Sequence, residues 1–81
     1  MTITVPGYST ITGTPEVILK LMQAARIIDA PEGDEYIERV KADAKRCFGI
    51  TLEAAGDTYP ERAESLLRSM AKNHMITLQD N

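Results

Sequence analysis

The sequence contains few of the residues on which disulfide-bonded, metal-binding and catalytic proteins depend. Its 81 residues include one cysteine, one histidine, one phenylalanine and no tryptophan. A single cysteine cannot form an intramolecular disulfide, which favours a reducing cytosol. One cysteine and one histidine cannot complete a zinc site unaided. We therefore expect no disulfide, no metal site and no cofactor.

Long apolar runs are also missing. None approaches the roughly 20 residues that span a membrane, and the N-terminus lacks the basic and apolar regions of a signal peptide. The net charge is −3, which disfavours a protein that coats nucleic acid. These absences predict a cytoplasmic protein that has no membrane partner and for which DNA is a disfavoured partner.

Groups suited to catalysis are scarce as well. Cys47 lies on the apolar side of a predicted helix, where a thiol usually acts as a small buried hydrophobe. His74 follows another predicted helix, where the helix dipole favours its charge and a role as general base is less expected. The five glycines are isolated from one another, so no phosphate-binding loop is present. We expect a protein that is not an enzyme.

β-Branched residues dominate the first twelve positions. Isoleucine or valine alternates with threonine on both sides of Pro6-Gly7, a pattern that is typical of strands. Proline followed by glycine suits the two central positions of a type II turn. We expect two short strands joined as a hairpin, and a single extended strand with a kink at Pro6 is the alternative.

The most apolar segment, residues 14–28, predicts the first helix. Thr14 is placed to cap this helix, and Glu16 faces the positive end of its dipole. Seven apolar residues recur at helical spacing and form one wide face, namely Val17, Ile18, Leu21, Met22, Ala24, Ala25 and Ile28. Leu19 and Ile27 fall outside that face. Because such a helix needs cover on more than one side, we expect homo-oligomerisation through it or burial against a larger partner.

Two further helices are predicted downstream. One runs from Asp34, as its cap, to Phe48, and Gly49 stops it. Its apolar stripe consists of Ile37, Val40, Ala44, Cys47 and Phe48. The other follows a capping box formed by Thr58 and Glu61 and continues to about residue 73. Its buried stripe consists of Tyr59, Ala63, Leu66, Leu67 and Met70.

The connection between these helices, residues 50–56, is ambiguous. We favour a single helical turn over a brief strand, because Glu53-Ala54-Ala55 has poor strand propensity. Residues 75–79 predict a final strand. Strands at both ends with helices between them predict one α+β domain over residues 1–81, in which three helices pack on a small antiparallel sheet made by the N-terminal strands and the C-terminal strand.

Acidic residues are concentrated between positions 29 and 38, with no basic residue among them. They are Asp29, Glu32, Asp34, Glu35 and Glu38. A solvated loop followed by a helix start explains such a run, because acids are favoured at a helix N-terminus. The other interpretation is an acidic surface that binds a basic surface of a protein partner.

The segment from the second helix to the end resembles the helix-turn-helix and first wing strand of winged-helix regulators. A long helix, a short turn, a third helix and the strand-like Met75-Ile-Thr-Leu follow in that order. The resemblance implies that the third helix contacts DNA through exposed side chains. These are Arg62, Ser65, Arg68, Ser69 and Lys72. Glu64 lies four residues before Arg68, so an ordinary surface ion pair explains part of this face.

The stretch Ile11-Thr-Gly-Thr-Pro-Glu16 looks like the start of many small proteins of Gram-positive bacteria, phages and mobile elements. We therefore predict a small non-enzymatic protein-interaction module. One version is a phage- or mobile-element-encoded inhibitor or adaptor that acts on a larger host complex through the acidic segment. The alternative is a winged-helix-like DNA-binding transcriptional regulator.

Overall fold

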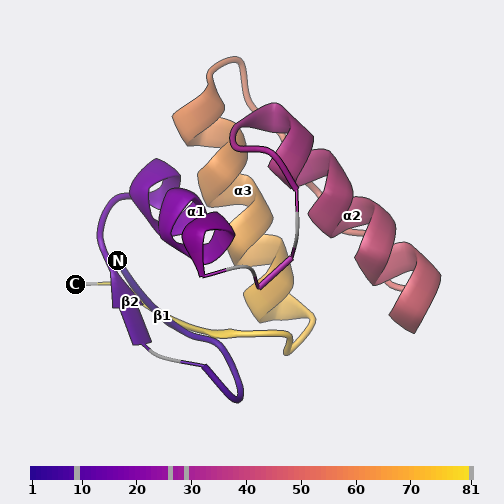
Figure 1. Ribbon diagram of the computed structural model, residues 1–81, viewed down its shortest axis with the longest axis horizontal. Helices are drawn as coiled ribbons and strands as arrows, with labels where there is room; N and C mark the ends of the chain where they lie inside the picture. The colour runs from indigo at the N-terminus through magenta and orange to yellow at the C-terminus, as the bar shows by residue number, and fades with distance from the viewer. Residues whose placement is uncertain (9, 26, 29, 81) are drawn as a thin grey trace.

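The chain folds into three helices and a three-stranded antiparallel sheet in a computed structural model that describes residues 1–8, 10–25, 27–28 and 30–80 (Figure 1). The elements in chain order are β1 (Thr2–Thr4), β2 (Thr10–Thr12), α1 (Pro15–Ala24), α2 (Asp34–Phe48), α3 (Tyr59–Lys72) and β3 (Thr77–Gln79). The predicted α+β fold is confirmed. None of the described helices is long and apolar enough to cross a membrane.

The N-terminal strands form the expected hairpin. The Tyr8 N–H donates to the Val5 carbonyl at 2.9 Å across Pro6 and Gly7. Gly7 has φ of 82°, as the third position of a type II turn requires. The alternative of one kinked strand is therefore wrong.

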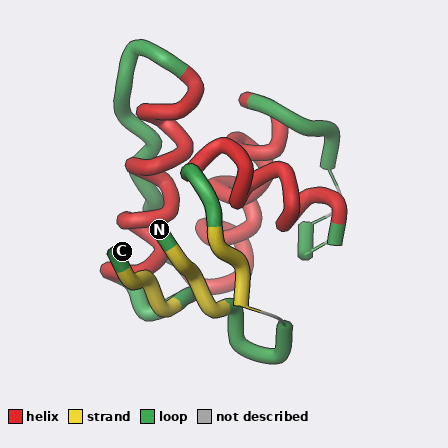
Figure 2. The backbone as a smooth tube through the Cα atoms, turned by 90° about the vertical axis from the view of Figure 1, so that its left-hand side faces the viewer, coloured by secondary structure: helices red, strands yellow, loops and turns green. Residues whose placement is uncertain are grey.

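The sheet has the strand order β2-β1-β3, so the N-terminal strand is central. Figure 2 shows the three strands side by side, with the two chain ends close together. Thr2 lies opposite Thr12 on one side and opposite Gln79 on the other. Because side chains alternate along a strand, Ile3 points to the helices and is fully buried, while the threonines line the opposite, outer face.

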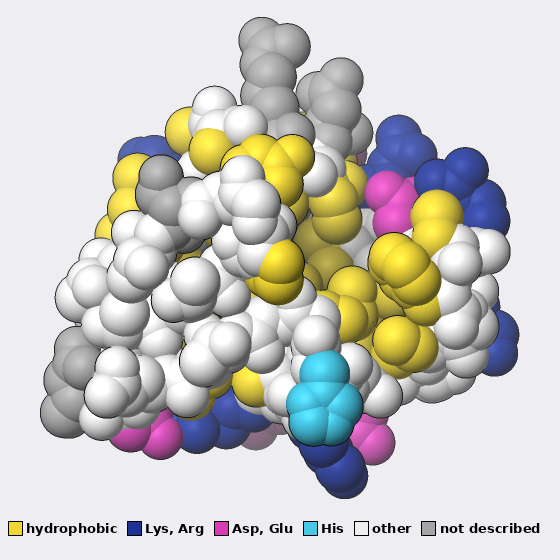
Figure 3. All heavy atoms as spheres, turned by 90° about the horizontal axis from the view of Figure 1, so that it is seen from below, with side chains coloured by type: hydrophobic (Ala, Val, Ile, Leu, Met, Phe, Trp, Pro, Cys, Tyr) yellow, Lys and Arg dark blue, Asp and Glu magenta, His cyan; other side chains and the backbone are white. Residues whose placement is uncertain are grey.

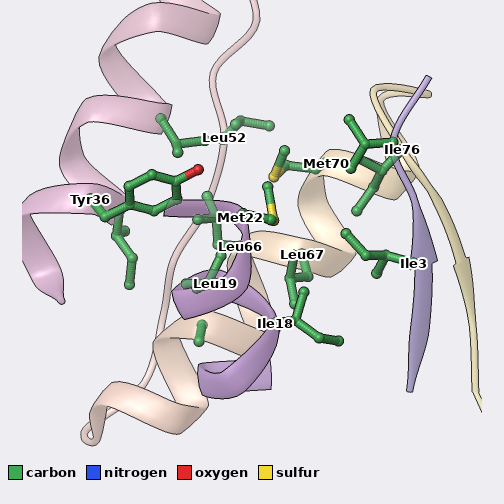
Figure 4. Close-up of a cluster of buried hydrophobic side chains, with 14 of the residues drawn as sticks. Ile3, Ile18, Leu19, Met22, Tyr36, Leu52, Leu66, Leu67, Met70 and Ile76 are labelled. Carbon is green, nitrogen blue, oxygen red and sulfur yellow. The ribbon is translucent and has the colours of Figure 1, made fainter. Parts of the chain in front are cut away.

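The helices cover one face of the sheet. α1 contacts β2, α3 contacts β3, and α1 and α3 pack against each other. α2 packs on α3, away from the sheet (Figure 1). The largest fully buried side chains come from the sheet and all three helices and include Ile3, Ile18, Leu19, Met22, Tyr36 and Leu66 (Figure 4).

The first helix differs from the prediction in length and in orientation. It ends at Ala24 rather than at Ile28. Its buried side chains are Ile18, Leu19 and Met22. Figure 4 shows these side chains beside those of α3. The helix is apolar on more than one side, and the side that includes Leu19 is buried because α3 covers it. Val17 and Leu21, predicted to be buried, are 43% and 44% exposed.

The second helix has the predicted bounds, but its buried stripe is displaced toward its start. Gly49 stops it with φ of 67°, whereas Gly33 rather than Asp34 occupies the N-cap position. Cys47 is exposed and Phe48 is 69% exposed, contrary to the prediction. The last turn extends away from α3 (Figure 1), and hydrophobic side chains lie at the surface beside Lys and Arg in the view from below (Figure 3). Tyr36 is buried instead.

The connection before α3 forms neither a helix nor a strand, so the predicted helical turn is wrong. Its backbone is held by α3 instead: the Glu53 N–H donates to the Ser69 Oγ at 3.0 Å, and the Ala55 N–H donates to the Ser65 Oγ at 2.9 Å. A backbone bonded in this way does not need intrahelical bonds. Leu52 anchors the segment in the core.

The start of α3 has the predicted capping box. The Glu61 N–H donates to the Thr58 Oγ at 3.3 Å, and the Thr58 N–H donates to the Glu61 carboxylate at 3.2 Å. Ala63, Leu66, Leu67 and Met70 are buried as predicted. Local capping signals therefore determine where this helix begins.

Candidate functional site

The acidic segment lies at the start of α2. Asp29 is outside the described residues. Glu32 precedes the helix, and Glu35 and Glu38 lie on its exposed side. Asp34 is occupied within the chain. Its Oδ1 and Oδ2 accept from Nε and Nη2 of Arg62 in α3 at 2.9 and 3.1 Å, a two-pronged pair that joins the starts of α2 and α3.

The remaining acids differ in their partners. Glu38 lies 3.8 Å from the Lys41 ammonium one turn away. Among the described residues, no ion pair involves Glu32 or Glu35. Part of the predicted surface therefore keeps an uncompensated negative charge, whereas Asp34 has a structural role.

The structure adds a pocket that the sequence analysis missed. It has a volume of about 370 Å³ and lies where α1, α2 and α3 begin. The residues that line it include Glu16, Leu19, Lys20, Glu32, Tyr36 and Tyr59, and we call it the acidic pocket. Val17, which is exposed, and the partly exposed Tyr59 supply most of the apolar surface, while Leu19 and Tyr36 are buried beneath it. Glu16 and Glu32 supply carboxylates, and Lys20 supplies a cation.

Electrostatics at Tyr59 show that carboxylates from separate elements converge here. Burial is the main cause that raises the pKa of Tyr59, and the negative charges of Asp34, Glu32 and Glu16 raise it further. The pKa of Glu16 is lowered, chiefly by a hydrogen bond from the Thr14 side chain. Glu16 is therefore ionised at neutral pH. Its sequence signal was only that of a residue in the first turn of a helix.

The acidic pocket has the chemistry of a cation-binding surface. A lysine or arginine side chain gains from an aromatic face and from nearby carboxylates together. Neither Cys47 nor His74 is among the residues described as lining the pocket. No group of three or more His, Cys, Asp and Glu side chains in the described part of the chain is placed to hold a metal ion.

A second, larger groove of about 700 Å³ lies between α3 and the connection before it. The groove includes most of the predicted DNA-contacting residues, but most of their side chains already form hydrogen bonds or ion pairs within the protein. Arg68 donates to Glu64 at 3.0 Å, the predicted ion pair, and also to Asp80 at 3.0 Å. The hydroxyls of Ser65 and Ser69 accept the two backbone bonds described above.

The charges around this groove are mixed. Glu53, Glu61 and Glu64 line it together with Arg68 and Lys72. Arg62, on the same helix, is bound to Asp34 and also donates to the Gly56 carbonyl at 3.4 Å. Of the five predicted residues, only Lys72 has no described ion pair or hydrogen bond. The arginines are therefore paired with carboxylates at the positions where a DNA-binding helix needs unpaired cations.

Comparison of the chain with protein-family models, with curated protein sequences and with solved structures gave no match. The geometry of the acidic pocket and of the α3 groove is therefore the basis for a functional proposal.

Proposed function

We propose that this chain is a small, cytoplasmic, non-enzymatic interaction module that binds a basic segment of a larger protein in the acidic pocket. One observation carries the proposal: carboxylates from α1 and from the segment before α2 meet beside two tyrosines in a pocket of about 370 Å³. A volume near the lower end of ligand-pocket sizes suits one side chain rather than a large molecule.

The charge balance supports a basic occupant. Asp34 is compensated by Arg62, so the carboxylates that remain for a partner are those of Glu16, Glu32 and Glu35. Lys20 offsets only part of this charge. Charges of this kind at the rim of an interface speed association and make binding weaken with salt.

A specific version of this proposal is an inhibitor or adaptor, encoded by a phage or mobile element, on a host complex that handles nucleic acid. Such complexes expose basic surfaces for phosphates. An acidic surface on a chain of 81 residues with net charge −3 is complementary to them. Occupation of a basic surface by this chain would exclude the nucleic acid from it.

The test is a tagged pull-down from nuclease-treated lysate, with bound proteins identified by mass spectrometry. The variant E16Q/E32Q removes two pocket carboxylates, and E53Q/D57N removes two exposed carboxylates elsewhere as a control of equal charge. We expect a stoichiometric partner with the native chain and the control, and at least a tenfold loss with E16Q/E32Q. Equal recovery with both variants would place the contact outside the acidic pocket.

The DNA-binding regulator stays a prediction. The segment between α2 and α3 lacks the short helix of a helix-turn-helix, and the two arginines are bound to carboxylates. Replacement of Arg62 and Lys72 with alanine should abolish any binding to duplex DNA in a gel-shift assay. Binding that survived both changes would remove this alternative.

A further inference from the structure

The outer edge of β2 presents unpaired backbone groups. The Gly13 N–H donates to the Met1 carbonyl at 3.0 Å, and the Met1 amino group donates to the Gly13 carbonyl at 3.0 Å. Hydrogen-bonded pairs alternate along an antiparallel ladder, so Ile11 also bonds toward β1. Thr10 and Thr12 then direct their N–H and C=O groups away from β1. In the described structure, no backbone group pairs with them.

In the described part of this edge, no charge, proline or bulge blocks pairing, although β2 is only three residues long. Natural edge strands are usually blocked by charges, proline or bulges, but Thr10, Ile11 and Thr12 are uncharged and in regular register with β1. The opposite edge differs, because Asp80 follows β3 at once and is bound to Arg68 of α3. The sheet is therefore open on the β2 side.

An apolar helix face lies next to the open edge. A groove of about 300 Å³ runs between β2 and α1 and includes Tyr8, Ile11 and Leu21. Leu21 and Ala25 line this groove, are exposed and lie four residues apart, so they form one apolar stripe at the end of α1. This apolar stripe is part of the helix surface for which the sequence analysis predicted a further contact, with a second copy or with a partner.

A second copy of this chain, related by a two-fold axis, would pair with the open edge of β2 and cover the apolar stripe on α1 at the same time. If the axis passes at Ile11, Thr10 of each copy lies opposite Thr12 of the other and exchanges two backbone hydrogen bonds with it. Ile11 then meets its own copy on the helix side of the sheet. The same rotation brings the stripe on α1 against the stripe of the other copy, as a closed two-fold interface requires.

We propose that the chain forms a two-fold dimer through β2 and α1, with a continuous six-stranded sheet. The molecule measures 30 × 30 × 23 Å, so one side is large enough for the roughly 600–1,000 Å² per partner of a specific interface. Glu16 and Lys20 line the acidic pocket near the start of α1, whereas Leu21 and Ala25 line the groove beside β2 near its end. The dimer therefore leaves two acidic pockets open.

Sedimentation equilibrium over a range of concentrations tests the dimer. The native chain should have twice its 8.9 kDa mass. L21K places a charge in the apolar stripe and should raise the dimer dissociation constant at least 100-fold. F48K makes the same kind of change at the exposed end of α2 and should leave it unchanged. A native chain that stays monomeric at millimolar concentration, or equal effects of the two variants, would overturn the proposal.

Amide hydrogen exchange tests the strand pairing separately. In the native dimer the Thr10 and Thr12 amides should exchange at least tenfold more slowly than in L21K at a concentration where L21K is monomeric. Circular dichroism and a cooperative melt show whether L21K is folded. Equally fast exchange of these two amides in a proven dimer would exclude pairing through β2. Neither result depends on the acidic pocket.

Discussion

At the scale of single residues, Tyr36 combines deep burial with an unsatisfied hydroxyl. Its side chain points from α2 into the hydrophobic cluster (Figure 4), and no described residue lies in hydrogen-bonding geometry with the hydroxyl. Burial raises the pKa of Tyr36 to about 12. The backbone N–H of Ile28 lies near enough to the hydroxyl to offset part of that rise, but not in the geometry of a hydrogen bond. An unsatisfied buried hydroxyl costs about 1–3 kcal/mol.

We expect Y36F to keep or increase the free energy of unfolding at pH 7, by up to about 1 kcal/mol, because it removes the unsatisfied group. Between pH 10 and 12 the unfolded tyrosine loses its proton while the folded one keeps it. The contribution of Tyr36 to the free energy of unfolding is therefore fully present below pH 10. It decreases as the pH rises from 10 to 12, by an amount on the order of 2–3 kcal/mol. Urea unfolding at pH 7 and at pH 12 measures this decrease, and Y36F should remove it.

Y59F is the comparison. The charge of Tyr59 makes a smaller contribution than burial to the raised pKa of Tyr36, so Y59F should leave most of the decrease in place. A loss of more than about 1 kcal/mol in Y36F at pH 7 would mean that the hydroxyl makes a stabilising bond.

Asp80 gives a prediction at acidic pH. Its pKa is lowered, chiefly by hydrogen bonds from Arg68. A lowered folded-state pKa means that the pair stabilises the fold above the usual aspartate pKa, and that this contribution is lost as pH falls through the lowered value. Because both side chains are largely exposed, the change in stability should be small.

The direct measurement is therefore an NMR titration of the Asp80 carboxyl. R68A should return its midpoint to about the ordinary value of 3.8, whereas E64Q should leave Asp80 paired. An unchanged Asp80 midpoint in R68A would exclude the pair in solution.

At the scale of elements, the two serines of α3 replace secondary structure in the connection before it. S65A and S69A each remove a hydroxyl that accepts a backbone N–H, so each should cost about 1 kcal/mol of stability. Amide exchange of Glu53 should accelerate in S69A, and that of Ala55 in S65A, while the interior of α3 stays protected. K72A, on the same side of α3, should accelerate neither amide. Unchanged exchange in both serine variants would mean that other contacts hold the connection.

The sequence predicted those elements whose limits are set locally. The capping box at Thr58 and the left-handed stop at Gly49 depend on neighbours within four residues, so α3 began, and α2 ended, where expected. The end of α1 was predicted from apolar periodicity and from the proline and glycine at positions 31 and 33, and the helix ends four residues earlier, at Ala24. The periodicity also did not distinguish Leu19 from Leu21, because α1 is apolar on both sides and only the position of α3 decides which side is buried.

The candidate site was less predictable than the fold, because it depends on contacts between distant segments. Position in the sequence indicated that the acids near α2 were clustered. It did not indicate that Arg62 would neutralise Asp34, or that Glu16 from α1 would lie near Glu32 and Tyr59. Arg68 was expected to pair with Glu64, four residues away. Its second partner, Asp80, lies near it only because β3 pairs in the sheet beside α3.

At the scale of the whole molecule, α1 separates two surfaces. Glu16 and Lys20 line the acidic pocket, whereas Leu21 lines the groove beside β2. A dimer through β2 and α1 would carry two acidic pockets, and a partner with two basic segments would then bind more tightly than either segment alone. L21K separates these effects, because it should weaken the binding of a two-site partner and leave the affinity for a single basic segment unchanged.

The most direct measurement is an NMR titration of the ¹⁵N-labelled chain with a short peptide rich in arginine and lysine. We expect saturable shifts centred on Glu16, Glu32 and Tyr59, weakened by salt and lost in E16Q/E32Q but not in E53Q/D57N. Shifts spread evenly over all acidic residues, or centred on the groove beside α3, would contradict binding in the acidic pocket.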